Sequence, residues 1–156
     1  MKRTELRENI FKLLFVSMFT EKEEMPEQLK LYFENMERLA ENDQTYMEEK
    51  VGNVLAKENE IDEILNGISK GWKTTRMSRV DLTILRLAVY EILFDADVPT
   101  GVAINEAVEL ANQAVYEHAQ LSEDFSGMGT TLVAAFVKTD LAIAVNVGDS
   151  RAYLLR

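Results

Sequence analysis

The side chains of this chain that could do chemistry are mostly basic, and they gather in two short clusters. Lys2, Arg3 and Arg7 stand at the start of the chain, and Lys73 and Arg76 stand in a connector that contains no acidic residue. Arginine and lysine bind the phosphates of nucleic acids, whereas basic residues at the start of a helix oppose its dipole. Each cluster is therefore a candidate RNA contact, and the alternative for the first is an ordinary solvated terminus.

Overall charge limits how such clusters can work. The 156 residues include 17 basic and 27 acidic side chains, which give a formal net charge of -10. Overall electrostatics therefore oppose nucleic-acid binding, and any RNA contact must depend on a local patch.

The sequence contains few residues that could bind a metal, undergo redox chemistry or catalyse a reaction. There is no cysteine and a single histidine, His118, so we expect no disulfide, no metal site and no cofactor. No nucleophile, oxyanion or phosphate-loop pattern is present, which argues against an enzyme. The first residues lack the apolar core of a signal peptide and no apolar run reaches membrane-spanning length. We expect a cytoplasmic protein without a membrane partner.

The basic connector, residues 69–79, also carries the only tryptophan, Trp72. An indole can stack on a nucleic-acid base, and such stacking contributes roughly 1–3 kcal/mol. The alternative is that the ring fills the junction between two groups of helices. We expect the second, because a tryptophan in a short connector is more often packed than free.

The stretch that must position this connector is residues 77–111. Ser78 is a good N-cap, and Asp81, three residues later, places negative charge near the positive end of the following helix. Apolar residues cover most of the circumference of residues 80–93, which predicts a buried helix. After a break at residues 95–101, a second helix is expected to begin near Val102.

Four amphipathic helices are predicted before this stretch. Pro26 suits the first position of a helix, Asp43 and Asn59 are candidate N-caps, and Gly71 fits a helix C-cap. Methionine and aromatic residues match the apolar face of each helix, so we assign them to the core.

Three segments of this first part resemble the NusB family of bacterial transcription antitermination factors. They are KRTELRENIFKLLF, IDEILNGISKGW, and RVDLTILRLAVYEIL followed by VP and VAINEAVELA. The resemblance covers residues 1–111 and implies a helical bundle that binds boxA-type leader RNA of ribosomal transcripts, together with the ribosomal protein NusE, on the transcribing RNA polymerase. It also implies that Lys2, Arg3 and Arg7 position RNA phosphates and that Asp81 takes part in binding NusE.

The sequence changes character beyond Ala111. Helical periodicity continues to about Leu121, and then Ser126, Gly127 and Gly129 break it. Two apolar runs, residues 131–137 and 141–147, predict strands joined by a tight loop, and residues 150–155 would be a third. Because three strands alone are marginal, we expect poor order or self-association through them.

Two motifs in this tail, SGMGTTLVAAF and LAIAVNVGDSRAYLL, resemble an internal segment of the metal-dependent PPM serine/threonine phosphatases. The resemblance covers residues 112–156 and implies that Asp149 lies near that family's metal centre. The other acidic elements of such a centre are missing, so we predict neither phosphatase activity nor a metal site.

These patterns predict a mainly α protein. Residues 1–111 are expected to form a NusB-like helical domain without its final helix, and residues 112–156 an appended helix with two to three antiparallel strands. The predicted function is RNA binding in antitermination, weakened by the replaced C-terminus. The alternative is an engineered or recombinant chimera with no evolved function of its own. The RNA-binding front of a ribosomal RNA methyltransferase is a third option, disfavoured because no cofactor-binding domain follows.

Overall fold

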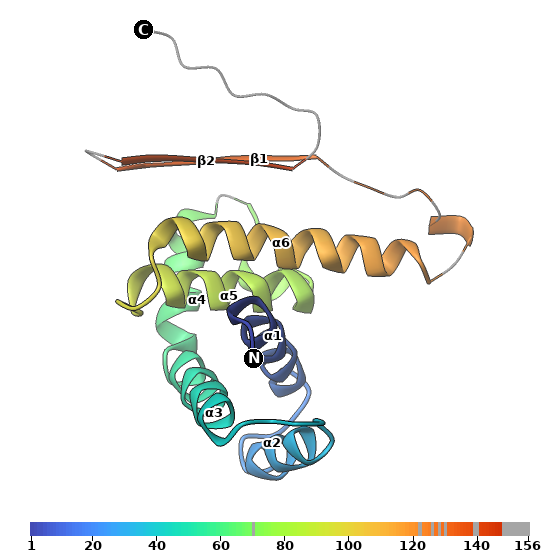
Figure 1. Cartoon of the computed structure of the whole chain (residues 1–156). Helices are drawn as coiled ribbons and strands as arrows, with labels where there is room; N and C mark the ends of the chain where they lie inside the picture. The colour runs from blue at the N-terminus through green and yellow to red at the C-terminus, as the bar shows by residue number, and fades with distance from the viewer. Residues whose placement is uncertain are drawn as a thin grey trace, which may run out of the picture. The chain divides into compact units, whose positions relative to one another are not determined.

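The computed structural model describes residues 1–69, 71–121, 123–125, 127, 129, 131–138 and 141–147, with 132–138 and 141–147 described by their backbone alone. The described residues form two compact units, Met1–Tyr90 and Glu91–Arg156, and the division falls within α5. Figure 1 labels the helices α1 (Arg3–Ser17), α2 (Met25–Glu34), α3 (Glu41–Ala56), α4 (Glu58–Ile68), α5 (Arg79–Leu93) and α6 (Thr100–Ala119) and the strands β1 (Leu132–Lys138) and β2 (Leu141–Val147). Two short 3₁₀ helices are η1 (Thr74–Arg76) and η2 (Glu123–Phe125).

The core of the first unit is built from one apolar face of each long helix. α1 packs against α3, and α3 contacts α4. The side chains that lie deepest recur every three or four residues, as an α-helix facing a core requires. They are Ile10 and Leu13 of α1, Met47, Val51 and Val54 of α3, Ile61 of α4 and Leu87 of α5. The prediction that these seven residues lie in the core is confirmed.

Some predicted helix starts are wrong by a few residues. α3 begins at Glu41, so Asp43 lies inside its first turn rather than at the N-cap. There the Asp43 carboxylate accepts a hydrogen bond of 2.6 Å from the Met1 ammonium, and this bond raises the pKa of the ammonium. α4 begins at Glu58 after Lys57, so Asn59 is likewise inside the first turn. Neither observed N-cap, Ala40 or Lys57, makes a side-chain capping hydrogen bond, so capping preference does not indicate these two starts.

Two side chains assigned to the core by their spacing lie on the surface instead. Ile68 is 75% exposed and Tyr46 is 42% exposed. Ile68 is the last residue of α4, so no further turn of helix follows to cover it. Helical spacing predicts which face a residue shares but not where the neighbouring helix ends.

Two polar side chains of α5, Thr83 and Arg86, are buried or half-buried among the helices of the first unit. Thr83 is 2% exposed, and its hydroxyl donates to the Arg79 carbonyl at 2.7 Å. Three residues further on, the Arg86 guanidinium donates to both carboxylate oxygens of Asp62, at 2.8 and 2.7 Å. α5 is therefore fixed to α4 by charge as well as by apolar packing.

The second unit contains α6 and the strand pair. α6 is continuous from Thr100 to Ala119, so the helix passes Ala111 without a break, as its periodicity predicted. β1 and β2 pair antiparallel, with Leu132 opposite Val147 and Lys138 opposite Leu141. The predicted third strand and Asp149 lie outside the described residues.

Candidate nucleic-acid interface

The first basic cluster is divided by the fold. Lys2 and Arg3 are exposed where α1 begins, and the Glu5 carboxylate accepts a hydrogen bond of 3.4 Å from the Lys2 backbone N–H. Arg7 is only 7% exposed. A phosphate in solution can therefore reach Lys2 and Arg3, whereas Arg7 would have to leave its packed position first.

The burial of Arg7 has a cause that is readable in the sequence. Arg7 precedes Ile10 by three residues and Leu14 by seven, and both of these are core residues. Residues at these spacings share one face of a helix, and the aliphatic stem of arginine packs well on such a face. The spacing that indicated the core residues of α1 therefore also indicated that Arg7 is buried, unlike Lys2 and Arg3.

The second cluster stands on a connector that is tied to the end of α4. The Asn66 side chain accepts from the Thr74 backbone N–H at 2.9 Å and donates to the Thr74 hydroxyl at 3.0 Å. Thr74 is buried, and the Lys73 ammonium donates to the Asn66 carbonyl at 2.7 Å. Gly71, at a φ of +87°, supplies the left-handed turn between α4 and this anchor. The connector is held at defined points.

Trp72 does not pack at the junction between helices, so the predicted packing role is wrong. The residue is 62% exposed. The Ser69 hydroxyl donates to its backbone carbonyl, and the guanidinium carbon of Arg76 lies 5.9 Å from the centroid of the indole. Lys73 and Arg76 are themselves exposed, so an aromatic face and two cations share this part of the surface.

Arg79, the last basic residue of the connector, has a structural position. Its guanidinium donates to the Met18 carbonyl at 2.8 Å and lies 4.1 Å from the centroid of Phe19. Met18 is the C-cap of α1, so Arg79 meets the negative end of that helix. Lys70 lies outside the described residues.

Asp81 is exposed in the first turn of α5. Its backbone N–H donates to the Ser78 hydroxyl at 3.1 Å, which confirms Ser78 as the cap of this helix. Because the backbone of Asp81 makes the capping bond, its carboxylate is not needed for that bond and can meet a partner.

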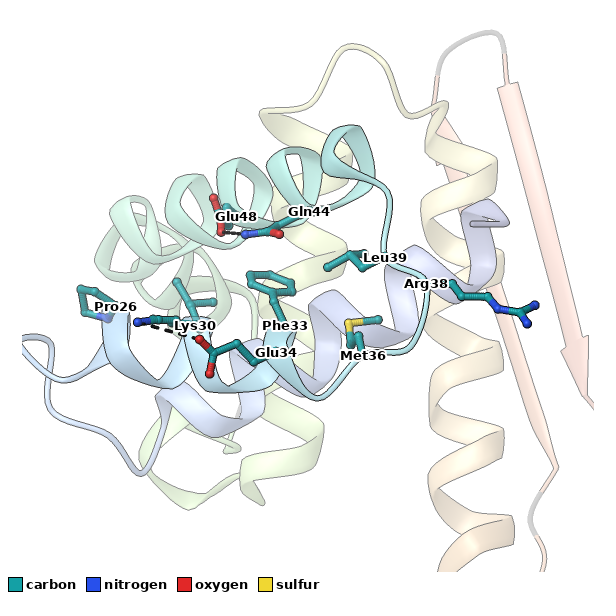
Figure 2. A pocket seen from close by; sticks show the side chains of 10 residues that line it. Pro26, Lys30, Phe33, Glu34, Met36, Arg38, Leu39, Gln44 and Glu48 are labelled. Atoms are coloured by element: carbon teal, nitrogen blue, oxygen red, sulfur yellow. Dashed lines mark hydrogen bonds and ion pairs between the residues drawn. The ribbon is translucent and has the colours of Figure 1, made fainter.

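A pocket of about 840 Å³ lies between α2 and the start of α3 (Figure 2). Phe33 and Met36 line it, Lys30 pairs with Glu34, and the Gln44 side-chain amide donates a hydrogen bond to the Glu48 carboxylate. Among the described residues, no group of three or more histidine, aspartate or glutamate side chains is arranged to hold a metal ion. The lining does not provide a nucleophile with an adjacent base, so we assign no chemistry to this pocket.

No helix in the described part of the chain is both long and apolar enough to cross a membrane.

Comparison with known proteins gives one family. Residues 4–121 match the model of the NusB family. The transcription antitermination protein NusB of Agathobacter rectalis is 45% identical over 113 residues, which cover 72% of this chain and 86% of that protein. NusB of Ruminiclostridium cellulolyticum is 36% identical over 141 residues, covering 90% of this chain and 92% of that protein. A solved structure of T. maritima NusB superposes with a TM-score of 0.63 at 26% identity and covers 80% of this chain and 82% of that one.

The family match extends further along the chain than the sequence motifs suggested. It ends at residue 121 rather than at Ala111, so it includes all of α6. The match to the Ruminiclostridium protein leaves only about a tenth of this chain outside it, and so it enters the tail. These comparisons give no support to a phosphatase-like segment, and they show an all-helical fold of six helices for the part that they cover.

Proposed function

The chain belongs to the NusB family of transcription antitermination proteins, and we propose that it holds boxA-type RNA of ribosomal transcripts together with the ribosomal protein NusE. The observation that carries the assignment is the family match over residues 4–121. A protein of this family acts by binding and is not an enzyme. Contact with RNA polymerase would be indirect, through the assembled RNA and protein.

In this proposal the RNA phosphates meet Lys2 and Arg3 on α1 and Lys73 and Arg76 on the connector. Exposure of all four side chains supports this role. The overall charge of -10 requires such local patches, because a phosphate backbone is repelled elsewhere. Arg7 was expected to be a fifth contact; because only 7% of it is exposed, we leave it out of the proposed set of phosphate contacts.

Asp81 is the proposed contact for NusE. Its carboxylate stands at the exposed start of α5, whose cap is provided by Ser78. Changing Asp81 to Asn removes a charge without removing the capping hydrogen bond, so D81N should weaken NusE binding and leave the thermal stability nearly unchanged.

The tail bears on affinity. The resemblance to the family predicts a final helix where this chain has β1 and β2, and in the family part of the RNA surface lies on that helix. We therefore propose that boxA affinity is lower than in a chain with the usual ending. The phosphatase-like motifs of the tail favour the alternative that the whole chain is a chimera. The comparisons with known proteins do not support that alternative.

Fluorescence anisotropy of labelled boxA RNA, measured with and without NusE, tests the proposal. We expect saturable binding that tightens when NusE is present, and weaker binding of an RNA of equal length and scrambled sequence. If the folded protein binds neither RNA, with NusE or without it, the proposed function is wrong.

A further inference from the structure

The single tryptophan of the chain, Trp72, is displayed on the surface. With 62% of its surface exposed, the residue forgoes the stabilisation that burial gives a large aromatic side chain. Trp72 is the only tryptophan in the sequence. An indole held in water is typical of a binding surface, because aromatic rings are enriched where partners dock.

Trp72 is exposed although hydrogen bonds hold the connector backbone around it. On one side of Trp72, the Ser69 hydroxyl donates to the Trp72 carbonyl. On the other side, Lys73 and Thr74 are both hydrogen-bonded to Asn66 of α4, and Thr74 is buried. The backbone on each side of the ring is therefore fixed to the end of α4, which orients the indole before any partner arrives.

The charged residues of the connector that carries the ring are all basic. The guanidinium carbon of Arg76 lies 5.9 Å from the ring centroid, within the range of a cation–π contact, and Lys73 follows Trp72 directly. Residues 69–79 contain no aspartate or glutamate, although the whole chain carries a net charge of -10. In single-stranded RNA every base has a phosphate on each side of it, and this arrangement of ring and cations is complementary to it.

We propose that Trp72 is a stacking site for an unpaired base of single-stranded RNA, with Lys73 and Arg76 holding the adjacent phosphates. The site, which rests on the proposed function, adds a base contact to what would otherwise be phosphate contacts alone. A duplex does not fit the site, because its bases are already stacked on each other and their faces are covered. A docking protein segment is disfavoured, since the Arg76 guanidinium lies near the ring and the connector around it is basic.

Because Trp72 is the only tryptophan, its emission, excited at a wavelength that the five tyrosines do not absorb, reports on this site alone. We expect titration with single-stranded boxA RNA to quench the emission and to saturate at the concentration at which anisotropy of the labelled RNA saturates. A duplex of the same sequence should leave the emission unchanged. An RNA with abasic positions throughout should bind by its phosphates without quenching.

Substitution gives an independent measure. W72A should weaken binding of single-stranded RNA about 5- to 100-fold, the loss expected for one base–aromatic stack, and W72F should restore most of it. I68A is the matched control, because Ile68 is an exposed apolar side chain at the adjacent end of α4. The RNA affinity of I68A should stay within about twofold of that of the unchanged protein. Circular dichroism and thermal melting of each variant check that the fold is kept.

The outcomes separate this inference from the proposed function. If the protein binds boxA RNA while the emission stays constant and W72A binds as tightly as the unchanged protein, the stacking site is wrong and the RNA-binding function stands. If the emission responds to NusE and not to RNA, the surface is a protein contact and the inference is also overturned. If no RNA binds at all, the proposed function itself fails.

Discussion

At the scale of single residues, Arg86 joins α5 to α4 through two carboxylates. Its guanidinium pairs with both oxygens of Asp62 and, at 2.6 Å, with Glu58. Burial opposes the charge of Arg86, but the hydrogen bonds and charges of the two carboxylates outweigh it and raise the pKa of Arg86 above its ordinary value. The planar guanidinium can satisfy both acids at once, which lysine cannot do.

Removing this side chain should leave two partly buried carboxylates without their partner. We expect R86M to lower the free energy of unfolding by about 1–3 kcal/mol, less than for a fully buried pair because Asp62 and Glu58 retain some access to water. K30M is the control, since the Lys30–Glu34 pair is exposed and should contribute less than about 0.5 kcal/mol. Equal losses in urea denaturation would show that the Arg86 cluster is not special.

Tyr32 provides a prediction about pH. Its hydroxyl donates to the Asn9 side chain at 2.6 Å. Burial raises the pKa of Tyr32 above its ordinary value of 10.0, Lys12 opposes the rise and Glu8 adds to it. Y32F should cost about 0.5–1.5 kcal/mol of stability near neutral pH, the value of one hydrogen bond.

Because the folded pKa of Tyr32 is raised, its contribution is complete below pH 10 and is lost as the pH rises through the folded value. The difference in stability between the unchanged protein and Y32F should therefore be constant from neutral pH to about pH 10 and shrink above it. If urea denaturation showed that this difference in stability grows above pH 10, the pKa of Tyr32 would be lowered rather than raised by folding.

Arg7 and Trp72 show what sequence reasoning can and cannot give at this scale. The burial of Arg7 follows from its spacing to Ile10 and Leu14, so the pattern contained that information. The exposure of Trp72 does not follow from any local pattern, because it depends on how hydrogen bonds to Asn66 fix the chain beyond the helix. Side-chain hydrogen bonds between a helix and a connector leave no periodic signal.

At the scale of elements, the connector between α4 and α5 depends on one side chain of α4. Asn66 makes both side-chain hydrogen bonds to Thr74. N66A should speed hydrogen exchange of the Thr74 amide about tenfold, which corresponds to the loss of about 1.4 kcal/mol of local protection. Amides in the middle of α1 should be unaffected.

N35A is the matched control for this prediction. Asn35 also donates from its side chain, but to the Leu31 carbonyl four residues before it, so it ties no second element down. Thr74 exchange should be unchanged in N35A. If both variants exchange alike, Asn66 does not hold the connector.

Elements were predicted better in their middles than at their ends. The apolar faces of α1, α3 and α4, the Ser78 cap and the continuity of α6 all follow from periodicity and capping preferences in the sequence. The starts of α3 and α4 do not, because the observed N-caps are Ala40 and Lys57, which make no side-chain capping hydrogen bond and so are not indicated by capping preference.

At the scale of the whole molecule, the contact-based division at Tyr90 and the proposed change of origin after Ala111 are different divisions of the chain. One separates regions by packing, and the other separates sequence by resemblance. The family match, which continues to residue 121, does not support a change at Ala111. Whether the tail associates with other copies is a separate question, and there the described residues form a sheet of only two strands.

A two-stranded sheet has two edges with backbone groups available for pairing, and it is marginal by itself. We expect the full chain to self-associate with increasing concentration in sedimentation experiments. A chain that ends at Leu121, where the family match ends, should remain monomeric and keep α1 to α6, so its helical content per residue should rise as the tail is removed. If both sediment as monomers at all concentrations, the strands do not drive self-association.

The central claim at this scale is that an acidic protein holds RNA through local basic patches. The salt dependence of boxA RNA affinity tests it most directly, comparing the unchanged protein with a variant carrying K2A, R3A, K73A and R76A. Each phosphate contact to a single strand contributes about 0.7 to the slope of log affinity against log salt, so the slope should fall by about 3 in the variant. A variant that keeps the original slope would show that RNA is held elsewhere on the molecule.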